Sequence, residues 1–380
     1  MIGTPKILRQ NKKKVLFIGS AVYDFPFNTT IDKKINALEE ISENYFFAFT
    51  NQAKLFPLRQ KNFFLLPNWK NQFSKVLYFW ISSFIYTLYF LHKNKNILVI
   101  AQGPGEGLSI AILKLFLKFN FVVEIHGDWK DTPLLYKKRL FPKIFSWFNL
   151  NLSNFVLHRA DKIRTISDFL TKKITKLFPA KKIITFPTYT DIEKFLVPNP
   201  NFEKIEKDLI FIGQLTYLKG LDVLIEAIAL LKNPNIKITI VGIGDYEAIL
   251  RKKINAKNLT SNFKFVGTKN TTELPTLIQK HKALVLPSFS EGLGRVLIEA
   301  LACYRPVIGS RVGGIPDIIN DGENGFLFSA GNAVMLSQKI NLILKNLDLI
   351  KKMGEAGQNL VKKNFSTEKY IAGYQKLIYK

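Results

Sequence analysis

The sequence predicts an α/β protein made of two Rossmann-like domains that face each other across a cleft. Short apolar runs alternate with helical stretches along the chain, and this alternation breaks once, in a Pro-, Asn- and charge-rich stretch at 187–207. The length of 380 residues leaves room for two full cores. We therefore divide the chain into a first domain (1–190), a linker (191–207), a second domain (208–365) and a C-terminal helix (366–380) that packs back on the first domain.

The first domain is expected to contain one parallel sheet covered by helices on both faces. GPGEG (103–107) is a glycine-rich loop that opens a helix. The predicted strands are 15–20, 44–50, 97–102, 121–127, 160–167 and 182–187, and the predicted helices are 31–43, 73–91 and 108–119.

The alternation restarts after the linker and predicts a second parallel sheet. Three helical stretches then close the chain, the last from about Thr367. The predicted strands are 208–213, 236–244, 263–268, 283–288, 305–310 and 325–328, and the helices between them are 219–232, one from Asp245, and one that starts near Gly294.

The chain is strongly basic, with a formal net charge of +26. Residues 1–200 hold 30 Lys and Arg against 13 Asp and Glu. Such an excess attracts anionic lipid headgroups, nucleic acid or an anionic substrate, although an AT-rich coding sequence produces the same bias. The single cysteine, Cys303, excludes an internal disulfide, and the four histidines show no metal-ligand spacing.

Three interpretations fit the apolar stretch from Phe73 to Leu91, which is about long enough to cross a bilayer. It contains Lys75 and several Ser and Tyr residues, and it falls where a crossover helix is expected. A buried core helix is therefore favoured over a helix lying partly in a membrane surface and over a transmembrane span. The earlier apolar run after Lys12–Lys14 is too short for a signal peptide and predicts the first strand.

The stretch from Ser288 to Gly314 holds two glutamates whose setting suggests a ligand. Glu291 lies in a glycine-flanked loop, and Glu299 lies on the second turn of the helix that follows. A strand, a glycine loop and a helix in this order direct free N–H groups and a positive dipole end at the loop, which favours an anion. Carboxylates near a bound diphosphate could accept bonds from hydroxyls on either side of it, as a nucleotide sugar provides. Alternatively, both glutamates are solvated charges on an ordinary helix.

Three further positions lie at strand ends. Lys219, before the helix that begins near Gly220, would direct a cation at a diphosphate, or is a solvated surface charge. Gly242 in GIGD lets the backbone approach a ligand, but the motif lacks the third glycine of a dinucleotide site. His126 in HGDW would orient a hydroxyl or stabilise charge, or it caps the following turn.

From about residue 97 onward, these pieces resemble the family 4 retaining glycosyltransferases of the GT-B fold, also described as glycosyl transferases group 1. The matching segments are GQLTYLKG, IVGIGD, FVGT, LVLPSFSEGLGRVLIEALACYRPVIGSRVGGIPDII and DGENGFLF, with HGDW and ADKIRTIS in the first half. The resemblance is poor in residues 1–96.

The resemblance implies a role for each matching residue. Glu299 would bind the donor ribose, while the backbone N–H groups of Leu293 and Gly294 would bind the diphosphate. Glu291 and His126 would hold the sugar, and Lys219 would neutralise the leaving diphosphate without a metal ion. The remaining residues expected at the donor are Arg295, Gly213, Gln214, Gly242 and Gly19.

Two positions depart from the family's pattern. The family often has Arg where Gln214 stands, and we hypothesise that Arg295 compensates for it. The glycine-rich loop after the first strand is reduced here to Gly19.

The resemblance therefore implies an enzyme that moves a hexose-type sugar from a UDP- or GDP-sugar to a glycan or lipid-linked acceptor in cell-surface polysaccharide synthesis, such as lipopolysaccharide. The acceptor would bind the first domain, and no cofactor or nucleic acid is expected. The location would be cytoplasmic, with peripheral contact to the inner face of the membrane through the basic first domain. The alternatives are a nucleotide-sugar epimerase or phosphorylase of the same fold, and a basic protein that binds membrane surfaces or nucleic acid.

Overall fold

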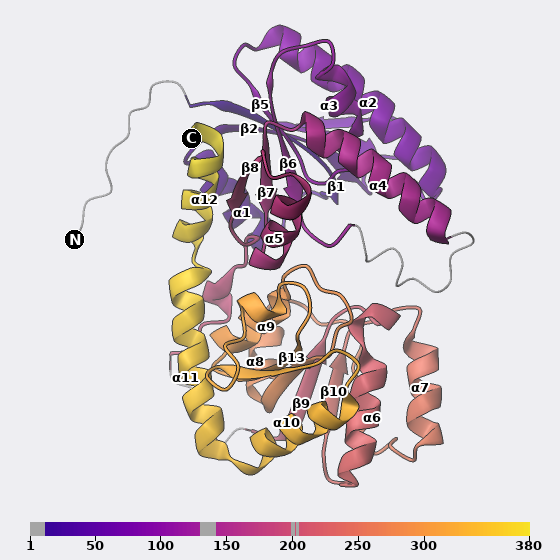
Figure 1. Ribbon diagram of the computed structural model, residues 1–380, viewed down its shortest axis with the longest axis vertical. Helices are drawn as coiled ribbons and strands as arrows, with labels where there is room; N and C mark the ends of the chain where they lie inside the picture. The colour runs from indigo at the N-terminus through magenta and orange to yellow at the C-terminus, as the bar shows by residue number, and fades with distance from the viewer. Residues whose placement is uncertain (1–11, 130–141, 199–201, 203–204) are drawn as a thin grey trace, which may run out of the picture.

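The computed structural model describes residues 12–129, 142–198, 202 and 205–380, and it places two sheets one above the other (Figure 1). The predicted class, α/β with two parallel-sheet domains, is confirmed. The upper sheet in this view belongs to the first half of the chain, and the lower sheet to the second half.

The first sheet has the strand order β3-β4-β2-β1-β5-β6-β7-β8. All neighbours pair in parallel except β3 and β4, a short antiparallel hairpin that the sequence analysis missed. The strands are β1 (Lys14–Val22), β2 (Glu43–Thr50), β3 (Leu58–Gln60), β4 (Phe63–Pro67), β5 (Leu98–Ala101), β6 (Asn120–Ile125), β7 (Lys162–Thr165) and β8 (Lys182–Thr185).

Helices cover both faces of this sheet, and α2, α3 and α4 pack together in one layer. The helix predicted over 108–119 is too long, because α3 ends at Leu113 and a turn leads to β6. The helices are α1 (Thr29–Glu39), α2 (Gln72–Lys93), α3 (Leu108–Leu113), α4 (Pro142–Arg159) and α5 (Asp168–Leu177).

One side of α2 is buried and the other is exposed. Phe79 and Phe90 pack in the core, whereas Phe73, Ile81 and Ile85 are exposed. The core interpretation of this stretch therefore holds for one side of the helix only. Among the described residues, no helix combines the length and the apolar character that crossing a membrane requires.

The second sheet is parallel throughout, in the order β11-β10-β9-β12-β13-β14. Its strands are β9 (Lys207–Ile212), β10 (Ile238–Val241), β11 (Phe263–Phe265), β12 (His281–Leu286), β13 (Val307–Ser310) and β14 (Gly325–Phe328). The helices around it are α6 (Leu221–Leu231), α7 (Glu247–Ala256), α8 (Leu274–Gln279), α9 (Arg295–Ala302), α10 (Ala333–Lys345) and α11 (Leu347–Asn364).

The last helix, α12 (Thr367–Tyr379), leaves the second domain and packs on β8 and α1 of the first. Figure 1 shows α11 and α12 in yellow along one side of both sheets. Tyr374 of α12 is buried, and its ring contacts Phe17 of β1 edge-on at 6.0 Å between centroids. The end of the chain therefore forms part of the first domain's core.

Candidate active site between the two sheets

The cleft between the two sheets has two lobes, of about 590 and 630 Å³. Five residues line both lobes, so the lobes meet at one place: His126, Gln214, Lys219, Glu291 and Gly292. His126 follows β6 of the first domain, and the other four follow strands of the second. Because parallel strands bring their carboxyl ends to one edge, residues far apart in the sequence gather here.

Lys219 and Glu291 form an ion pair at the junction of the lobes. Lys219 Nζ lies 2.6 Å from Glu291 Oε2, and Ser288 Oγ donates to the same oxygen at 3.4 Å. Lys219 ends a short 3₁₀ turn, and Gly220 then takes a left-handed conformation with φ +65°. A Cβ atom at Gly220 would lie 1.9 Å from Pro287 O, so only glycine allows the lysine to come so close to the Glu291 loop. The structure thus brings a cation and a carboxylate together where the lobes join.

The N-terminus of α9 opens into the lobe of about 630 Å³. Leu293, Gly294 and Arg295 line this lobe. Gly294 precedes the helix with φ +89°, and no side chain caps the helix end. Since the first turn of a helix presents N–H groups without intrahelical acceptors, this end of α9 favours an anionic ligand.

Glu299 lies one turn into α9, and it lines neither lobe directly. The residue is 7% exposed, and its contact with charge is Arg295 Nε at 3.4 Å. Burial raises the pKa of this carboxyl to about 7, while the Arg295 guanidinium acts in the opposite direction. An otherwise apolar helix therefore holds a buried carboxyl group, and an additional hydrogen-bond donor would stabilise its charged form.

His126 is held from below by a buried charged network. Its Nε2 lies 3.0 Å from Glu124 Oε2, and the other oxygen, Glu124 Oε1, accepts from Arg164 at 2.9 Å and from Tyr374 at 2.5 Å. Burial opposes the charged carboxylate, but Arg164 and His126 hold the pKa of Glu124 well below its ordinary value. A carboxylate only accepts hydrogen bonds, so the proton of His126 lies on Nε2, and Nδ1 is the nitrogen left for other partners.

The loop of Gly313 and Gly314 is in contact with the Glu291 loop. Gly313 has φ +53°, and a Cβ atom there would lie 1.7 Å from Glu291 O. Across the cleft, a Cβ atom on Gly292 would lie 2.3 Å from the carbonyl oxygen of His126. The two domains therefore touch through main-chain atoms beside the Lys219–Glu291 pair.

The remaining predicted donor residues divide into two groups. Gly213 and Gln214 line the cleft. Gly242 and Gly19 do not appear on its walls, and each lies behind a residue that does. A Cβ atom on Gly242 would meet Gly213 O at 1.9 Å, and one on Gly19 would meet the side chain of Gln102 at 2.1 Å.

Three charged residues at or beside the cleft were not predicted from the sequence: Lys34, Glu124 and Asp128. Lys34 comes from α1 and lines the lobe that contains Arg295. Burial lowers its pKa, while Glu124 raises it and Arg164 and Arg295 lower it further. Lys34 gave no signal because it is one of many lysines, and the charge of Glu124 was hidden in an apolar strand. Asp128, in HGDW, pairs with Lys173 at 2.7 Å and also lines the cleft.

Among the residues described, no group of three or more His, Cys, Asp or Glu side chains could hold a metal ion. Cys303 is buried at the end of α9, as expected for a small core residue.

Comparison with known proteins places this cleft in context. A model of the family Glycosyl transferases group 1 matches residues 193–360. An uncharacterized glycosyltransferase of Methanocaldococcus jannaschii is 31% identical over 275 residues, which cover 72% of each chain. The capsular polysaccharide biosynthesis glycosyltransferase CapM of Staphylococcus aureus is 25% identical and covers 76% of this chain and 78% of its own.

Solved structures share the fold over nearly the whole chain. Sucrose-phosphate synthase from Thermosynechococcus elongatus aligns with a TM-score of 0.78 and 17% identity, over 97% of this chain and 98% of its own. Anabaena HepE, crystallised with UDP and glucose, aligns with a TM-score of 0.73 and 17% identity, over 97% and 99%. Together with the cleft geometry, these matches show that the chain is a glycosyltransferase of the glycosyl transferases group 1 family, with its two-domain GT-B architecture.

Proposed function

We propose that this glycosyltransferase transfers a hexose-type sugar from a UDP- or GDP-sugar to a hydroxyl of a glycan or lipid-linked acceptor, with retention of anomeric configuration. The observation that carries the proposal is the Lys219–Glu291 pair of 2.6 Å where both lobes meet, beside the N-terminus of α9. A cation and a helix end suit a diphosphate, and a carboxylate beside them suits sugar hydroxyls. Anabaena HepE, similar in fold, was crystallised with UDP-glucose, which supports a nucleotide-sugar donor.

The diphosphate would lie at the end of α9, against the N–H groups of Leu293 and Gly294. Lys219 would exchange its contact with Glu291 for a phosphate oxygen. Glu291, released from the lysine, would accept bonds from the sugar hydroxyls. The ion pair therefore keeps each group in position before the donor arrives.

The chemical step breaks the bond between the anomeric carbon and the phosphate oxygen, and the electron pair leaves with the diphosphate. The acceptor oxygen bonds to the same face of that carbon, and its proton passes to the departing phosphate oxygen. Lys219 and the dipole of α9 stabilise the charge that develops on the leaving group, which is the largest electrostatic demand of the step. Nδ1 of His126 faces the sugar from the other domain and orients it.

Glu299 would accept hydrogen bonds from the ribose hydroxyls of the nucleotide. Its burial with Arg295 as its charged neighbour leaves a carboxyl group in need of donors. Donor binding thus offsets part of the cost of keeping this group inside the helix packing.

We also propose that transfer needs no metal ion or cofactor, because Lys219, Arg295 and the end of α9 supply positive charge at the diphosphate. A chelator such as EDTA should leave the initial rate unchanged. Loss of activity with EDTA, restored by a divalent cation, would overturn this part of the proposal.

We also propose a role in cell-surface polysaccharide synthesis, and its support is the name of one relative, the capsular polysaccharide biosynthesis glycosyltransferase CapM of Staphylococcus aureus. We further propose a cytoplasmic location with peripheral contact to the inner face of the membrane. The support is the exposed apolar side of α2 together with the basic charge of residues 1–200.

The direct test is a panel of nucleotide sugars, screened first by thermal shift and then by donor hydrolysis and transfer. One UDP- or GDP-sugar should raise the melting temperature and be hydrolysed slowly without acceptor. Isomerised donor would indicate an epimerase, and dependence on inorganic phosphate would indicate a phosphorylase. Undiminished activity of Glu299→Ala would contradict the donor site assigned here, and salt-sensitive nucleic-acid binding without any donor binding would contradict the enzyme.

A further inference from the structure

We propose that a groove between α2 and α4 holds the hydrocarbon chain of a lipid-linked acceptor and leads it to the catalytic cleft. This inference rests on the proposed transfer to such an acceptor, and it adds the place where the lipid part binds. The groove has a volume of about 710 Å³, within the range of about 300–1,000 Å³ that small-molecule pockets occupy.

Apolar side chains form most of the groove. They come from β2, α2 and α4, and include Phe49, Phe73, Val76, Trp80, Phe148 and Leu152. Phe73 is 80% exposed and Phe148 is 51% exposed, so the apolar lining is open to solvent at the outer end. A hydrocarbon chain is the ligand that gains most from such a lining.

A single loop separates the groove from the catalytic cleft. Gly103 and Pro104 line the cleft, while the next two residues, Gly105 and Glu106, line the groove. Asn149 of α4 lines both. Trp80 Nε1 donates to Gly105 O at 2.8 Å, which fixes this loop to α2. A chain lying in the groove therefore ends beside the cleft, where a polar head carrying the acceptor hydroxyl would project.

The polar residues of the groove are Ser20, Gln72, Lys75, Glu106 and Asn149, and three of them make side-chain contacts within the protein. Ser20 Oγ donates to Glu106 Oε1 at 2.6 Å, and Lys75 Nζ donates to Asn68 Oδ1 at 2.5 Å. Both contacts are made within the protein, so these groups leave the apolar walls free for a chain.

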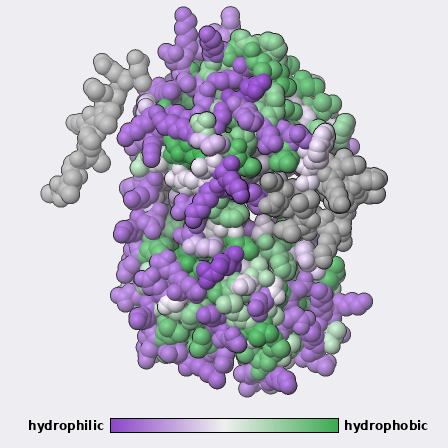
Figure 2. Space-filling model, in the orientation of Figure 1, coloured by the Kyte–Doolittle hydropathy of each residue, from purple (hydrophilic) through white to green (hydrophobic). Residues whose placement is uncertain are grey.

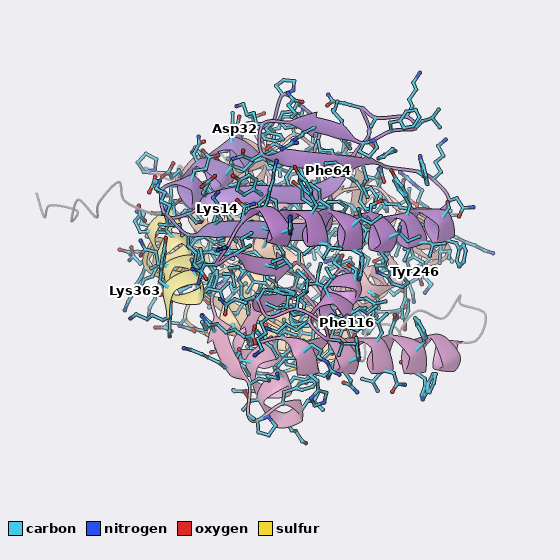
Figure 3. The ribbon with its side chains drawn as sticks, turned by 90° about the horizontal axis from the view of Figure 1, so that it is seen from above. Lys14, Asp32, Phe64, Phe116, Tyr246 and Lys363 are labelled. Atoms are coloured by element: carbon cyan, nitrogen blue, oxygen red, sulfur yellow. The ribbon has the colours of Figure 1, made fainter. Side chains whose placement is uncertain are left out.

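Beyond the groove, α2 and the turn after α3 carry an exposed apolar surface. Leu77, Ile81, Ile85 and Phe116 belong to it, and Phe116 is 78% exposed. Figure 2 shows hydrophobic residues gathered over α2 and α3, and Figure 3 shows the labelled Phe116 between α2 and α4. An exposed apolar surface of this kind is typical of contact with a membrane or a partner. The groove thus connects a surface suited to lipid with the place of sugar transfer.

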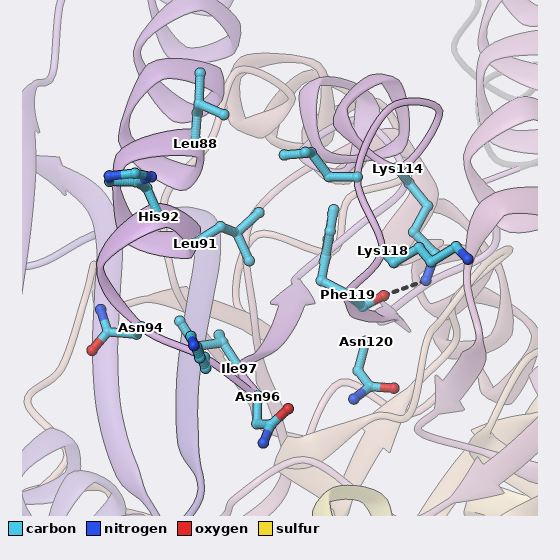
Figure 4. A pocket seen from close by; sticks show the side chains of 12 residues that line it. Leu88, Leu91, His92, Asn94, Asn96, Ile97, Lys114, Lys118, Phe119 and Asn120 are labelled. Atoms are coloured by element: carbon cyan, nitrogen blue, oxygen red, sulfur yellow. Dashed lines mark hydrogen bonds between the residues drawn. The ribbon is translucent and has the colours of Figure 1, made fainter.

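A second cavity at the far end of α2 provides a contrast (Figure 4). Its walls carry His92, Lys95, Lys114 and Lys118, and Lys114 donates to Phe119 O and pairs with Asp161 at 2.6 Å. Within the part of the chain that the structure describes, it shares no lining residue with the catalytic cleft. This cavity is more polar and offers no route for a chain toward the site of transfer.

The experiment uses alkyl glucosides as probes, with hexyl, octyl and decyl chains below the concentrations at which they form micelles. Binding to the full-length protein is measured by calorimetry. Each buried methylene should tighten binding about fourfold. A decyl glucoside with a diazirine at the end of its chain is then cross-linked to the protein, and the labelled peptides are identified by mass spectrometry.

Two variants test the groove itself. Val76→Trp fills it from an exposed position, and Phe148→Lys places a charge in its apolar wall. Ile85→Trp is the matched control, because Ile85 is exposed on the same helix but does not line the groove. Both groove variants should lose the dependence on chain length and the cross-links to α2 and α4, whereas the control retains both. Hydrolysis of the nucleotide sugar should remain unchanged in all three.

Equal binding of all chain lengths, cross-links outside α2 and α4, or equal loss in the Ile85→Trp control would overturn the groove proposal. In each of these cases, donor hydrolysis by the wild type still supports the proposed function. Absence of donor binding and hydrolysis in the wild type would instead overturn the proposed function, whatever the glucosides show.

Discussion

The hydroxyl of Tyr374, six residues from the end of the chain, donates a 2.5 Å hydrogen bond to Glu124, whose other carboxylate oxygen lies 3.0 Å from Nε2 of His126. The last helix therefore helps to hold the histidine that lines the cleft. Arg164 completes the network with a 2.9 Å bond to Glu124. A histidine in the cleft is thus positioned by groups that do not line the cleft themselves.

Tyr374→Phe should destabilise the protein by about 1.5–3 kcal/mol, the usual contribution of a hydrogen bond to a charged group. It should also lower kcat while leaving donor affinity unchanged, because Glu124 then positions His126 less firmly. Urea unfolding and donor hydrolysis measure the two effects. Tyr379→Phe is the control: its hydroxyl donates to the neutral Ile41 carbonyl at 2.6 Å, so it should lose stability but keep kcat. Equal kcat in both variants would show that Tyr374 is only structural.

Two buried groups should give the stability of the second domain opposing pH dependences. Glu299 has a pKa raised to about 7, so its protonated form is favoured in the folded state, and stability falls as pH rises from about 4.5 to 7. His281 has a pKa lowered by burial to about 4, so its neutral form is favoured, and stability falls as pH drops from about 6.5 to 4. Each contributes about 3 kcal/mol at full effect.

Glu299→Gln should therefore stabilise the protein at about pH 8 and have little effect at about pH 4.5. That variant lacks the Glu299 slope and keeps the His281 slope, so its stability should rise with pH between about 4 and 6.5 more than that of the wild type. Urea unfolding across this range, followed by a domain-specific probe, tests the sign. A variant with the same pH profile as the wild type would contradict the burial effect assigned to Glu299.

Donor affinity should depend on the same carboxyl. The ribose hydroxyls donate to the charged form, so affinity should weaken by up to about tenfold for each pH unit below the pKa of about 7. Calorimetry with the donor found in the panel measures this dependence. Glu299→Gln should bind the donor more weakly at neutral pH, and its affinity should vary much less with pH. A wild-type affinity that is constant between pH 5 and 8 would count against a charged ribose acceptor.

Lys34 and Arg295 both line the lobe at the end of α9, where Gln214 stands in place of a cation. We expect Lys34→Met and Arg295→Ala each to weaken donor binding by about ten- to a hundredfold, the range for a lost charged hydrogen bond. Lys176→Met, an exposed change on α5, controls for lost net charge. If Arg295→Ala leaves affinity unchanged while Lys219→Ala abolishes it, Arg295 does not compensate for Gln214. Unchanged affinity in Lys34→Met likewise removes Lys34 from the donor site.

Much of the fold could be predicted, because apolar runs of strand length mark the sheet whatever their partners are. The hairpin of β3 and β4 was missed since its residues, LRQ and FFLLP, are short and lie beside a polar loop. The end of α3 was placed too late because the apolar residues after Leu113 continue the helical pattern but belong to a turn. The local sequence pattern does not show the tertiary contacts that pair two short strands or end a helix.

The site could be predicted in part. Glu291, Lys219 and His126 follow strand ends, and the sheet topology brings them together as the sequence suggested. Glu124 and Tyr374 could not be found, because the contact joins residues 250 positions apart and both are buried. Gly19 was expected at the donor but does not line the cleft, because the side chain of Gln102 covers it. This contact forms only in the folded chain, so the sequence did not show it.

Gly292 of the second domain lies directly against the carbonyl oxygen of His126 of the first domain. A methyl group at Gly292 would lie 2.3 Å from that oxygen, too close for any real carbon atom. Gly292→Ala therefore acts as a spacer that holds the domains apart, yet it removes no charge and no hydrogen-bonding side chain. The added carbon should leave nucleotide binding to the second domain intact. It should keep His126 of the first domain away from the Lys219–Glu291 pair, so that binding occurs without completion of the reaction centre.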